Sequence, residues 1–422
     1  MFDRTLVVRA ARAARGARAA RALFTVAMGA VAVCLCAASR GATLPTSPPP
    51  NVGAYYYPWY GTFGGGHGWT DNMRSKLVPA QSPALGQYNS RLSSTIESHI
   101  DQSHRGNINF WATSWWGPGS AEDSTIRNNI FTDPRAGEMK YAVNYESTGR
   151  LGTFANPNFA TFTSDFQYLG QNYFNNPNYL KVNNRPVVFI YLTRAYFNGS
   201  TAAAAVATMR QTMQSQFGVN PYLVGDDVFP GQTSATRAAL WDAIDDFDVY
   251  GSVLQGNGST TAAVNALTAQ YQNAKQVAQS AGVGFIPTVT PGFNDSGVRS
   301  GHPAAPRYLT DVANSGEGSL FSAELDQSVL PNLDAAAGNM MMVSTFNEWH
   351  EDTQIEPSNI APATSIDISG SNTYSQGYAY TGYGNLYLDL LHQKTFVPEP
   401  GSVGALAIAA LALRRRRRRS VW

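Results

Sequence analysis

Cysteine is nearly absent from this chain of 422 residues, which contains two, Cys34 and Cys36. Both lie within an apolar stretch near the N-terminus, residues 22–38, and the rest of the chain has none. This absence excludes a disulfide framework, a thiol nucleophile and any cysteine-based zinc or iron–sulfur site from the remaining body.

Basic residues are also scarce in the body of the chain. Of the 30 lysines and arginines, 13 are arginines of the two ends, residues 1–42 and 397–422. The body between these ends keeps 17 basic and 27 acidic residues, although the whole chain has a formal net charge of +1. An acidic body argues against nucleic-acid binding, because phosphate contacts require clustered lysine and arginine. Aromatic residues make up 12% of the chain, which is ample for a packed core and too much for disorder.

The N-terminal end has the layout of a secretory signal peptide. Residues 1–21 are basic, residues 22–38 are apolar, and Ala37 and Ser39 have the spacing of a cleavage site. The alternative is a transmembrane anchor, because the stretch approaches the ~20 residues that a span needs. No lipobox is present, since Val33 precedes Cys34. We expect a signal peptide over residues 1–42, followed by a proline-rich linker over residues 43–50.

The C-terminal end, residues 397–422, combines three features in a fixed order. Val397-Pro398-Glu399-Pro400 comes first, an apolar segment follows over residues 401–413, and six arginines occupy residues 414–419. This end resembles the PEP-CTERM sorting tail of exported bacterial proteins. The resemblance implies exosortase-type sorting machinery as a partner, transient membrane association through the tail, and an extracellular or cell-surface location in a bacterium with an exosortase system. A nucleic-acid-binding tail is the weaker alternative, because nothing else in the chain supports it.

Eight short apolar runs, rich in β-branched and aromatic residues, recur along the body and predict parallel strands that are covered on both faces. They are residues 52–59, 108–115, 141–145, 186–192, 222–226, 247–251, 283–290 and 340–346. Helical patterns lie between them, most clearly at residues 93–104, 158–173, 201–217, 261–281 and 319–337. This alternation predicts an α/β fold, a single (β/α)8 TIM barrel with enlarged loops over residues 51–396. No Gly-x-Gly-x-x-Gly follows the first strand, so a nucleotide-binding doubly wound sheet is disfavoured.

Aromatic side chains stand beside carboxylates and amides at the ends of most of these runs. In a TIM barrel the chemistry lies at the C-terminal ends of the strands. Aromatic rings can lie against the apolar face of a sugar ring, while carboxylates and amides bind its hydroxyls. Any one such residue is more often a packing residue, but their recurrence on seven of the eight strand ends predicts a carbohydrate site.

Glu348 and Glu351 are the most specific candidates for a catalytic acid–base pair. On a continuing strand their side chains would point to opposite faces, so they can converge only if the strand ends near Phe346 and the chain curls into a turn. Two close carboxyl groups oppose each other's ionisation, so one pKa rises and an acid and a base coexist. Glycosidic cleavage needs such a pair. The alternative for this short motif alone is two solvated loop carboxylates.

Three longer motifs carry a resemblance to a known family. They are the segments 56–61 (YYPWYG), 115–119 (WWGPG) and 346–357 (FNEWHEDTQIEP). Together they resemble glycoside hydrolase family 99, the endo-α-1,2-mannosidase and endo-α-1,2-mannanase family, from about residue 52 to 391. The resemblance implies a (β/α)8 barrel, endo-acting cleavage with retention of configuration, no metal and no other cofactor, and a polysaccharide or glycan as substrate.

The family's mechanism is substrate-assisted and proceeds through a 1,2-anhydro sugar. Carried onto this sequence, the resemblance implies that Glu348 is the base toward the sugar 2-hydroxyl and Glu351 the general acid and base. The substrate-binding residues that we expect around them are Tyr57, Trp59, Tyr60, His67, Trp115, Trp116, Glu146, Tyr191, Tyr250, Asn347 and His350. A non-catalytic cell-surface carbohydrate-binding protein on the same barrel is the alternative function. A structural protein of the surface matrix is a third and weaker possibility.

Two features depart from the family pattern. Asp352 stands where the family commonly has glycine, and we expect it to raise the pKa of Glu351 or to narrow the cleft. The first loop, residues 61–69, is rich in glycine, which leaves the glycan and its linkage open. No histidine pair has the spacing of metal ligands, and we expect His99 and His104 to be solvated on a surface helix.

Overall fold

The computed structural model describes residues 49–396. The expected signal peptide, residues 43–48 of the linker and the sorting tail lie outside the described residues. Within the described part of the chain, no helix is long and apolar enough to cross a membrane.

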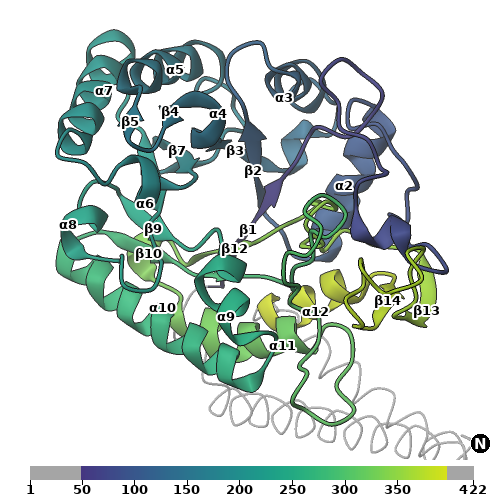
Figure 1. Cartoon of the computed structure of the whole chain (residues 1–422). Coiled ribbons are helices and arrows are strands. Elements are labelled where there is room, and N and C mark those ends of the chain that lie inside the picture. Colours follow the sequence, from purple (N-terminus) through teal and green to yellow (C-terminus); the bar gives the residue numbers. More distant parts are fainter. Residues whose placement is uncertain (1–48, 397–422) are drawn as a thin grey trace, which may run out of the picture. The chain divides into compact units, whose positions relative to one another are not determined.

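A parallel barrel forms the centre of this body (Figure 1). Every neighbouring pair of strands around it is parallel. In chain order the barrel strands are β1 (Asn51–Tyr56), β2 (Phe110–Trp115), β3 (Lys140–Tyr145), β7 (Arg185–Ile190), β8 (Tyr222–Asp226), β9 (Ala243–Asp245), β10 (Gly284–Ile286), β11 (Thr288–Val289) and β12 (Met340–Val343).

The barrel closes through a strand that is broken in the middle. β10 pairs with β9 on one side, and β11 pairs with β12 on the other. Pro287 lies between them and has no N–H to donate, but its carbonyl accepts a hydrogen bond from the Met342 N–H at 3.0 Å. Because β10 and β11 together fill one position, the barrel has eight strand positions, and the prediction of a (β/α)8 fold is confirmed.

The barrel interior is filled by side chains of the barrel strands, in the manner of a packed core. Tyr55, Phe110, Phe189 and Met342 are buried there. Gly53 belongs to this packing, because a Cβ at that position would lie 2.1 Å from the Phe110 ring. The opposite faces of the strands pack against the helices, which explains why the runs read as continuously apolar.

Helices surround the barrel (Figure 1). Local chemistry sets both ends of α10, which starts where the Thr260 side chain accepts a hydrogen bond from the Ala263 N–H and stops at Gly282, whose φ is +73°. The longer helices are α2 (Ser93–Arg105), α5 (Phe159–Asn172), α7 (Ala202–Phe217), α10 (Thr261–Ala281) and α12 (Leu386–Thr395), and the shorter ones are α3 (Ala121–Thr125), α4 (Ser147–Arg150), α6 (Thr193–Tyr196), α8 (Ala235–Ala238), α9 (Gln255–Asn257) and α11 (Ser319–Glu324).

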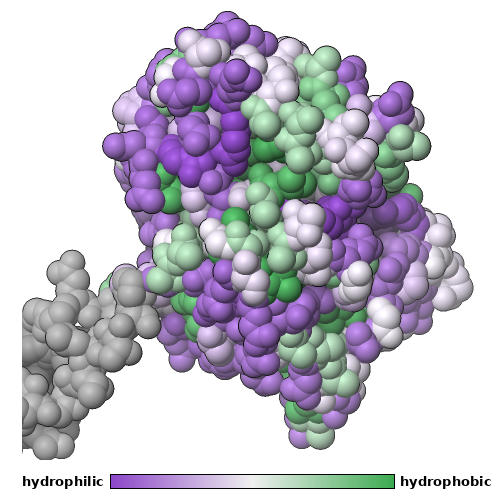
Figure 2. Space-filling view, turned by 90° about the vertical axis from the view of Figure 1, so that its left-hand side faces the viewer, coloured by the Kyte–Doolittle hydropathy of each residue, from purple (hydrophilic) through white to green (hydrophobic). Residues whose placement is uncertain are grey.

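Three small antiparallel strand pairs lie outside the parallel pairing of the barrel. β4 (Gly152–Thr153) pairs with β5 (Asn156–Pro157), and β6 (Lys181–Val182) pairs with β7. β13 (Ile360–Thr364) pairs with β14 (Tyr380–Tyr383) after the last barrel strand. On the side that carries α7 and α8, polar and apolar atoms are interspersed over the surface (Figure 2).

One element prediction is wrong, and another holds over only part of its length. The sixth strand is β9, residues Ala243–Asp245, rather than residues 247–251, and the chain turns helical at Tyr250–Leu254 because the Asp248 carboxylate accepts the Gly251 N–H at 2.8 Å. The predicted helix over residues 319–337 is helical from Ser319 to Asn332, where α11 (Ser319–Glu324) continues without a break into a π-helical turn at Leu325–Val329 and tighter helical turns after it. Pro331 lies among those turns.

Candidate active site

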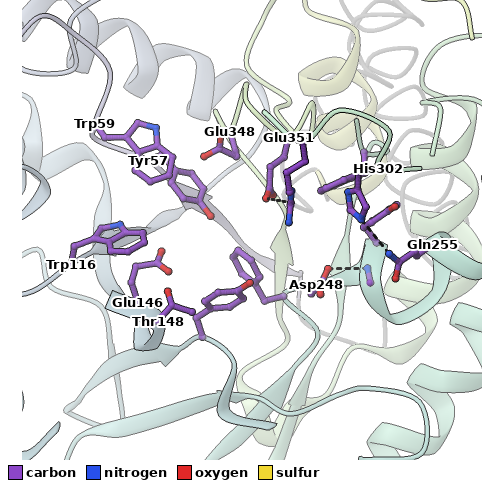
Figure 3. Close-up of a pocket in the computed structure, with 16 residues that line it drawn as sticks. Tyr57, Trp59, Trp116, Glu146, Thr148, Asp248, Gln255, His302, Glu348 and Glu351 are labelled. Atoms are coloured by element: carbon purple, nitrogen blue, oxygen red, sulfur yellow. Dashed lines mark hydrogen bonds and ion pairs between the residues drawn. The ribbon is translucent and has the colours of Figure 1, made fainter. Parts of the chain in front are cut away.

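Two cavities adjoin at the C-terminal end of the barrel. Their volumes are about 360 and 540 Å³, and both are lined by Trp59, Arg299, Glu348 and Glu351. Figure 3 shows Glu348 and Glu351 projecting from the same side of the first cavity, with Trp116 and Glu146 across from them. The two acid side chains therefore converge on one cleft, as the sequence predicts.

The convergence depends on a closed loop after β12. The Thr345 N–H donates to the Thr353 carbonyl at 2.8 Å, and the Thr353 N–H donates back to the Glu348 carbonyl at 3.3 Å. Inside this loop the Glu348 N–H donates to the Thr345 hydroxyl at 2.9 Å. The strand ends at Val343, a few residues before Phe346, and the predicted turn follows.

Several donors fix the orientation of Glu348. Its Oε1 accepts hydrogen bonds from the His350 N–H at 2.9 Å and from the Tyr60 hydroxyl at 3.4 Å, and it lies 3.0 Å from His350 Nδ1. Burial alone would lower the pKa of His350. The hydrogen bond to Glu348 and the negative charge of Glu348 outweigh that effect, so the pKa of His350 is raised above its ordinary value. Glu348 is only 3% exposed, and its carboxylate is therefore held in one position at the cleft wall.

Glu351 is more open and faces both cavities, with 38% of its side chain exposed. Its backbone carbonyl accepts the Asn294 N–H at 2.8 Å, and its Oε1 lies 3.4 Å from an Arg299 nitrogen. Desolvation within the cleft, with the charges of Glu348 and Asp248, raises the pKa of Glu351 to about 8, while Arg299 opposes the rise. Glu351 therefore carries a proton at neutral pH, as a general acid requires.

One wall of the first cavity is formed by Tyr57, Trp116 and Glu146. The Glu146 carboxylate accepts hydrogen bonds from the Ser114 hydroxyl at 2.7 Å and the Asn144 amide at 3.1 Å, and burial raises its pKa to about 8. The Ser114 hydroxyl also accepts the indole N–H of Trp116 at 3.0 Å. This shared hydroxyl fixes an aromatic face and a carboxyl group side by side, as recognition of a sugar ring requires.

The opposite wall is built by the loops after β7, β9 and β11. Tyr191, Phe247, Asp248 and Tyr250 line it, and the Tyr250 ring stacks on Phe293 with centroids 3.8 Å apart. Burial raises the pKa of Asp248 to about 6, although the Gly251 N–H and Arg194 hold its carboxylate.

The second cavity shares Glu348 and Glu351 with the first. The Trp59 indole stacks on the His67 ring at 4.4 Å with an interplanar angle of 11°. Burial, with the neighbouring His350, lowers the pKa of His67. Asp71 and Asp295 complete a polar wall.

The sequence profile described as glycosyl hydrolase family 99 matches residues 50–367. The chain belongs to glycosyl hydrolase family 99. Glycoprotein endo-alpha-1,2-mannosidase of Mus musculus is 25% identical over an alignment that covers 73% of this chain and 68% of that protein. The Xenopus laevis protein of the same name is 22% identical, with 73% and 70% coverage. The solved structure of a family 99 endo-alpha-mannosidase from Bacteroides thetaiotaomicron has the same fold, with a TM-score of 0.57, 19% identity, and coverage of 82% of this chain and 95% of that one.

Within this family 99 barrel, most of the predicted site residues line one or both cavities. These are Tyr57, Trp59, His67, Trp116, Glu146, Tyr191, Tyr250, Glu348, His350 and Glu351. No group of three or more metal-ligating side chains is found in residues 49–396.

Three predicted substrate contacts are absent from the cavity walls. Tyr60 and Asn347 are buried behind the wall, where the Asn347 side chain holds the backbone N–H and carbonyl of Tyr57 at 2.8 and 3.0 Å. Trp115 is fully buried in the outer core, and its indole N–H donates to Asp123 at 3.0 Å. The prediction that Trp115 contacts the substrate is wrong, because alternate residues of β2 face opposite sides of the sheet.

Two further expectations are corrected. His99 is fully buried rather than solvated, and its ring nitrogens contact Tyr56 at 2.9 Å and Glu356 at 3.2 Å. Asp352 is also buried and points away from the cleft toward Arg74 and Arg307, so it neither narrows the cleft nor raises the pKa of Glu351.

Several residues that the sequence-based reasoning missed line the cavities. Arg299 and His302 belong to the long loop after β11, where no motif marks them. Asp248 and Phe293 stand near strand ends and could have been found by extending the search to every polar or aromatic residue there. Asp295 follows the predicted seventh strand together with Phe293, whereas Asp71 carries no sequence signal that distinguishes it from other loop carboxylates.

Proposed function

We propose that this chain is an exported, endo-acting and retaining glycosidase that cleaves α-mannosidic linkages of the α-1,2 type within a polysaccharide or glycan. The observation that carries the proposal is the convergence of Glu348 and Glu351 on one cleft, with a raised pKa on Glu351. The linkage is inferred from the relatives named endo-alpha-1,2-mannosidase, which are about a quarter identical to this chain.

In the first step Glu348 accepts the proton of the 2-hydroxyl, and O2 of the same sugar attacks its anomeric carbon. The bond from that carbon to the leaving oxygen breaks, and Glu351 donates its proton to that oxygen. The product is a 1,2-anhydro sugar, together with a protonated Glu348 and an ionised Glu351. The intramolecular attack is favoured because nucleophile and electrophile belong to one ring held in place.

In the second step Glu351 accepts a proton from water, whose oxygen attacks the anomeric carbon and opens the anhydro ring. O2 recovers its proton from Glu348, so both carboxyl groups return to their starting states. The anomeric carbon is inverted twice, and the configuration is retained.

Endo-action is supported by the two cavities that adjoin at the acid pair. Sugar units can lie on both sides of the cleaved bond, against Tyr57 and Trp116 in the first cavity and His67 in the second, with Trp59 lining both. Export and surface sorting are proposed from the terminal segments of the sequence alone, with an exosortase-type machinery as the partner.

The test is to incubate purified protein with α-1,2-linked mannan and to measure new reducing ends. Glu351→Gln should lower the rate on natural substrates by about 10²–10⁴-fold, because the leaving oxygen then departs unprotonated. Glu348→Gln should abolish turnover as well, since no other group takes the 2-hydroxyl proton.

Glu138→Gln is the matched control, because Glu138 is an exposed carboxylate just before β3, at the opposite end of the barrel. Hydrolysis near the wild-type rate by Glu351→Gln would refute the assigned roles. Binding of mannan without any hydrolysis by the wild-type protein would favour a carbohydrate-binding protein.

A further inference from the structure

A third, smaller cavity of about 180 Å³ lies outside the cleft. It is formed between the β4–β5 hairpin and the turn that follows α6. Its lining includes Phe154 and Tyr196 together with the polar residues Asn156, Asn198, Ser200 and Thr201. None of the lining residues is charged.

Phe154 gives this cavity an aromatic face. It occupies the tip of the hairpin, and 54% of its surface is exposed, although large apolar side chains are normally buried. The Phe154 and Tyr196 rings make an edge-to-face contact, with centroids 4.8 Å apart and an interplanar angle of 69°. The Tyr196 hydroxyl donates to the Gly152 carbonyl at 3.2 Å, which ties the hairpin to α6. The ring is therefore held in place with much of its surface left free.

The remaining wall supplies hydrogen-bonding groups. Asn156, Asn198, Ser200 and Thr201 are exposed at the cavity, so their amides and hydroxyls are accessible to a ligand. An exposed ring beside neutral donors and acceptors matches the apolar face and the hydroxyls of a pyranose. A phosphate, a sulfate or a charged peptide would find no counter-charge among these residues.

The cavity shares its supporting loops with the cleft. Thr148 lines the cleft from α4, and the chain passes from α4 directly into β4. Tyr191 lines the cleft just before α6, whose last residue is Tyr196. Figure 1 shows α4, the hairpin and α6 grouped together beside the barrel. A polysaccharide chain that leaves the cleft past Thr148 and Tyr191 therefore meets the hairpin next.

We propose that this cavity is an additional carbohydrate-binding site that takes one neutral pyranose unit of the polysaccharide, outside the units held in the catalytic cleft. The identity of the ligand rests on the proposed function, whereas the site itself rests on the hairpin geometry. Such a site increases the affinity for long chains, because a second contact on the same chain is intramolecular. Short oligosaccharides that fill only the cleft gain nothing from it.

The test compares Phe154→Ala with the wild-type protein on long-chain mannan and on a short manno-oligosaccharide. Loss of the stacking surface should raise KM for the polymer about fivefold, with kcat unchanged, as expected from the apolar area removed. KM for the oligosaccharide should not change, and Phe154→Tyr should restore the polymer value. Phe396→Ala is the matched control, since Phe396 is 50% exposed and stacks on His392 at the end of α12.

Binding without turnover is measured by affinity electrophoresis in gels that contain mannan or another neutral polysaccharide. Phe154→Ala should be retarded less than the wild-type protein. An unchanged polymer KM and unchanged retardation in this variant would overturn the site, and so would an equal rise of KM on the oligosaccharide. A wild-type protein that is retarded through Phe154 but hydrolyses nothing would leave the site standing and overturn the proposed function instead.

Discussion

At the scale of single residues, the protonation of Glu351 is set by its neighbours in the cleft. Desolvation, Glu348 and Asp248 raise its pKa to about 8, and Arg299 acts in the opposite direction. A general acid is active only in its protonated form. We therefore expect kcat/KM on mannan to stay high at neutral pH and to fall as the pH rises through about 8, in a pH profile of initial rates.

Two substitutions should shift the alkaline limb of this pH profile, the fall of kcat/KM near pH 8, in opposite directions. Arg299→Met removes the cation 3.4 Å from Glu351, so the limb should move to higher pH. Asp248→Asn removes a carboxylate that raises the pKa of Glu351, so the limb should move to lower pH. Because both residues line the cleft, KM can change in either variant, and the position of the limb is the decisive readout. Shifts in the same direction would show that Glu351 is not the group that titrates.

At the scale of elements, Glu356 holds the catalytic loop against α2 and the loop that precedes it. Its fully buried carboxylate accepts hydrogen bonds from the Trp349 indole at 2.8 Å and the Tyr88 hydroxyl at 2.9 Å, and it lies 3.2 Å from a His99 ring nitrogen. The Asn347 amide donates to the same Tyr88 hydroxyl at 3.2 Å. The residues before and after Glu348 are thus fixed by a single carboxylate, which lies outside the cavities.

Glu356→Ala should therefore destabilise the protein by about 3 kcal/mol, because three buried polar groups lose their partner. Urea unfolding followed by tryptophan fluorescence measures the loss. Glu97→Ala is the control on the adjoining helix α2, and it should change the free energy of unfolding by less than about 0.5 kcal/mol, since Glu97 is only partly buried. Equal effects of the two substitutions would refute the anchoring role of Glu356.

Much of the barrel could be predicted from the sequence, because strands buried on both faces read as continuous apolar runs. The β9 region shows where this signal fails. Residues 247–251 contain aromatic and apolar residues like a buried strand, but Phe247 and Tyr250 line the cleft wall instead. His99 shows a similar limit, since its polar identity gave no sign of the distant partners Tyr56 and Glu356. Local sequence patterns predict helices and strands, whereas contacts between residues far apart in the sequence can be seen only once the fold is known.

At the scale of the whole molecule, buried charges join the segment after β12 to the barrel. Arg74 and Arg307 are fully buried, and both pair with Asp352 and Glu317. Both guanidinium groups also lie over the Tyr383 ring of β14, at 5.0 and 4.7 Å. The β13–β14 pair is thus attached to the loop that carries Glu351, and Asp352 serves this attachment rather than the cleft.

Other buried carboxyl groups have no cationic partner and give the fold a distinct pH dependence. Glu324 is fully buried, and only one of its oxygens has a partner among the described residues, the Thr290 N–H at 3.0 Å. Burial raises its pKa from the ordinary value of 4.5 to about 8. Between these two values the unfolded chain releases the proton and the folded chain keeps it, so this group makes folding less favourable as the pH rises.

Thermal unfolding should therefore show a melting temperature that falls between pH 5 and pH 8.5, because Glu146 and Glu324 both have a pKa near 8 in the folded protein. Glu324→Gln removes one contribution, on the order of 4 kcal/mol across this pH range, and should make the decline shallower. Glu97→Gln should leave the decline as it is in the wild-type protein, because Glu97 is only partly buried. A decline that is equally steep in Glu324→Gln would mean that this carboxyl group does not hold its proton when the barrel is folded.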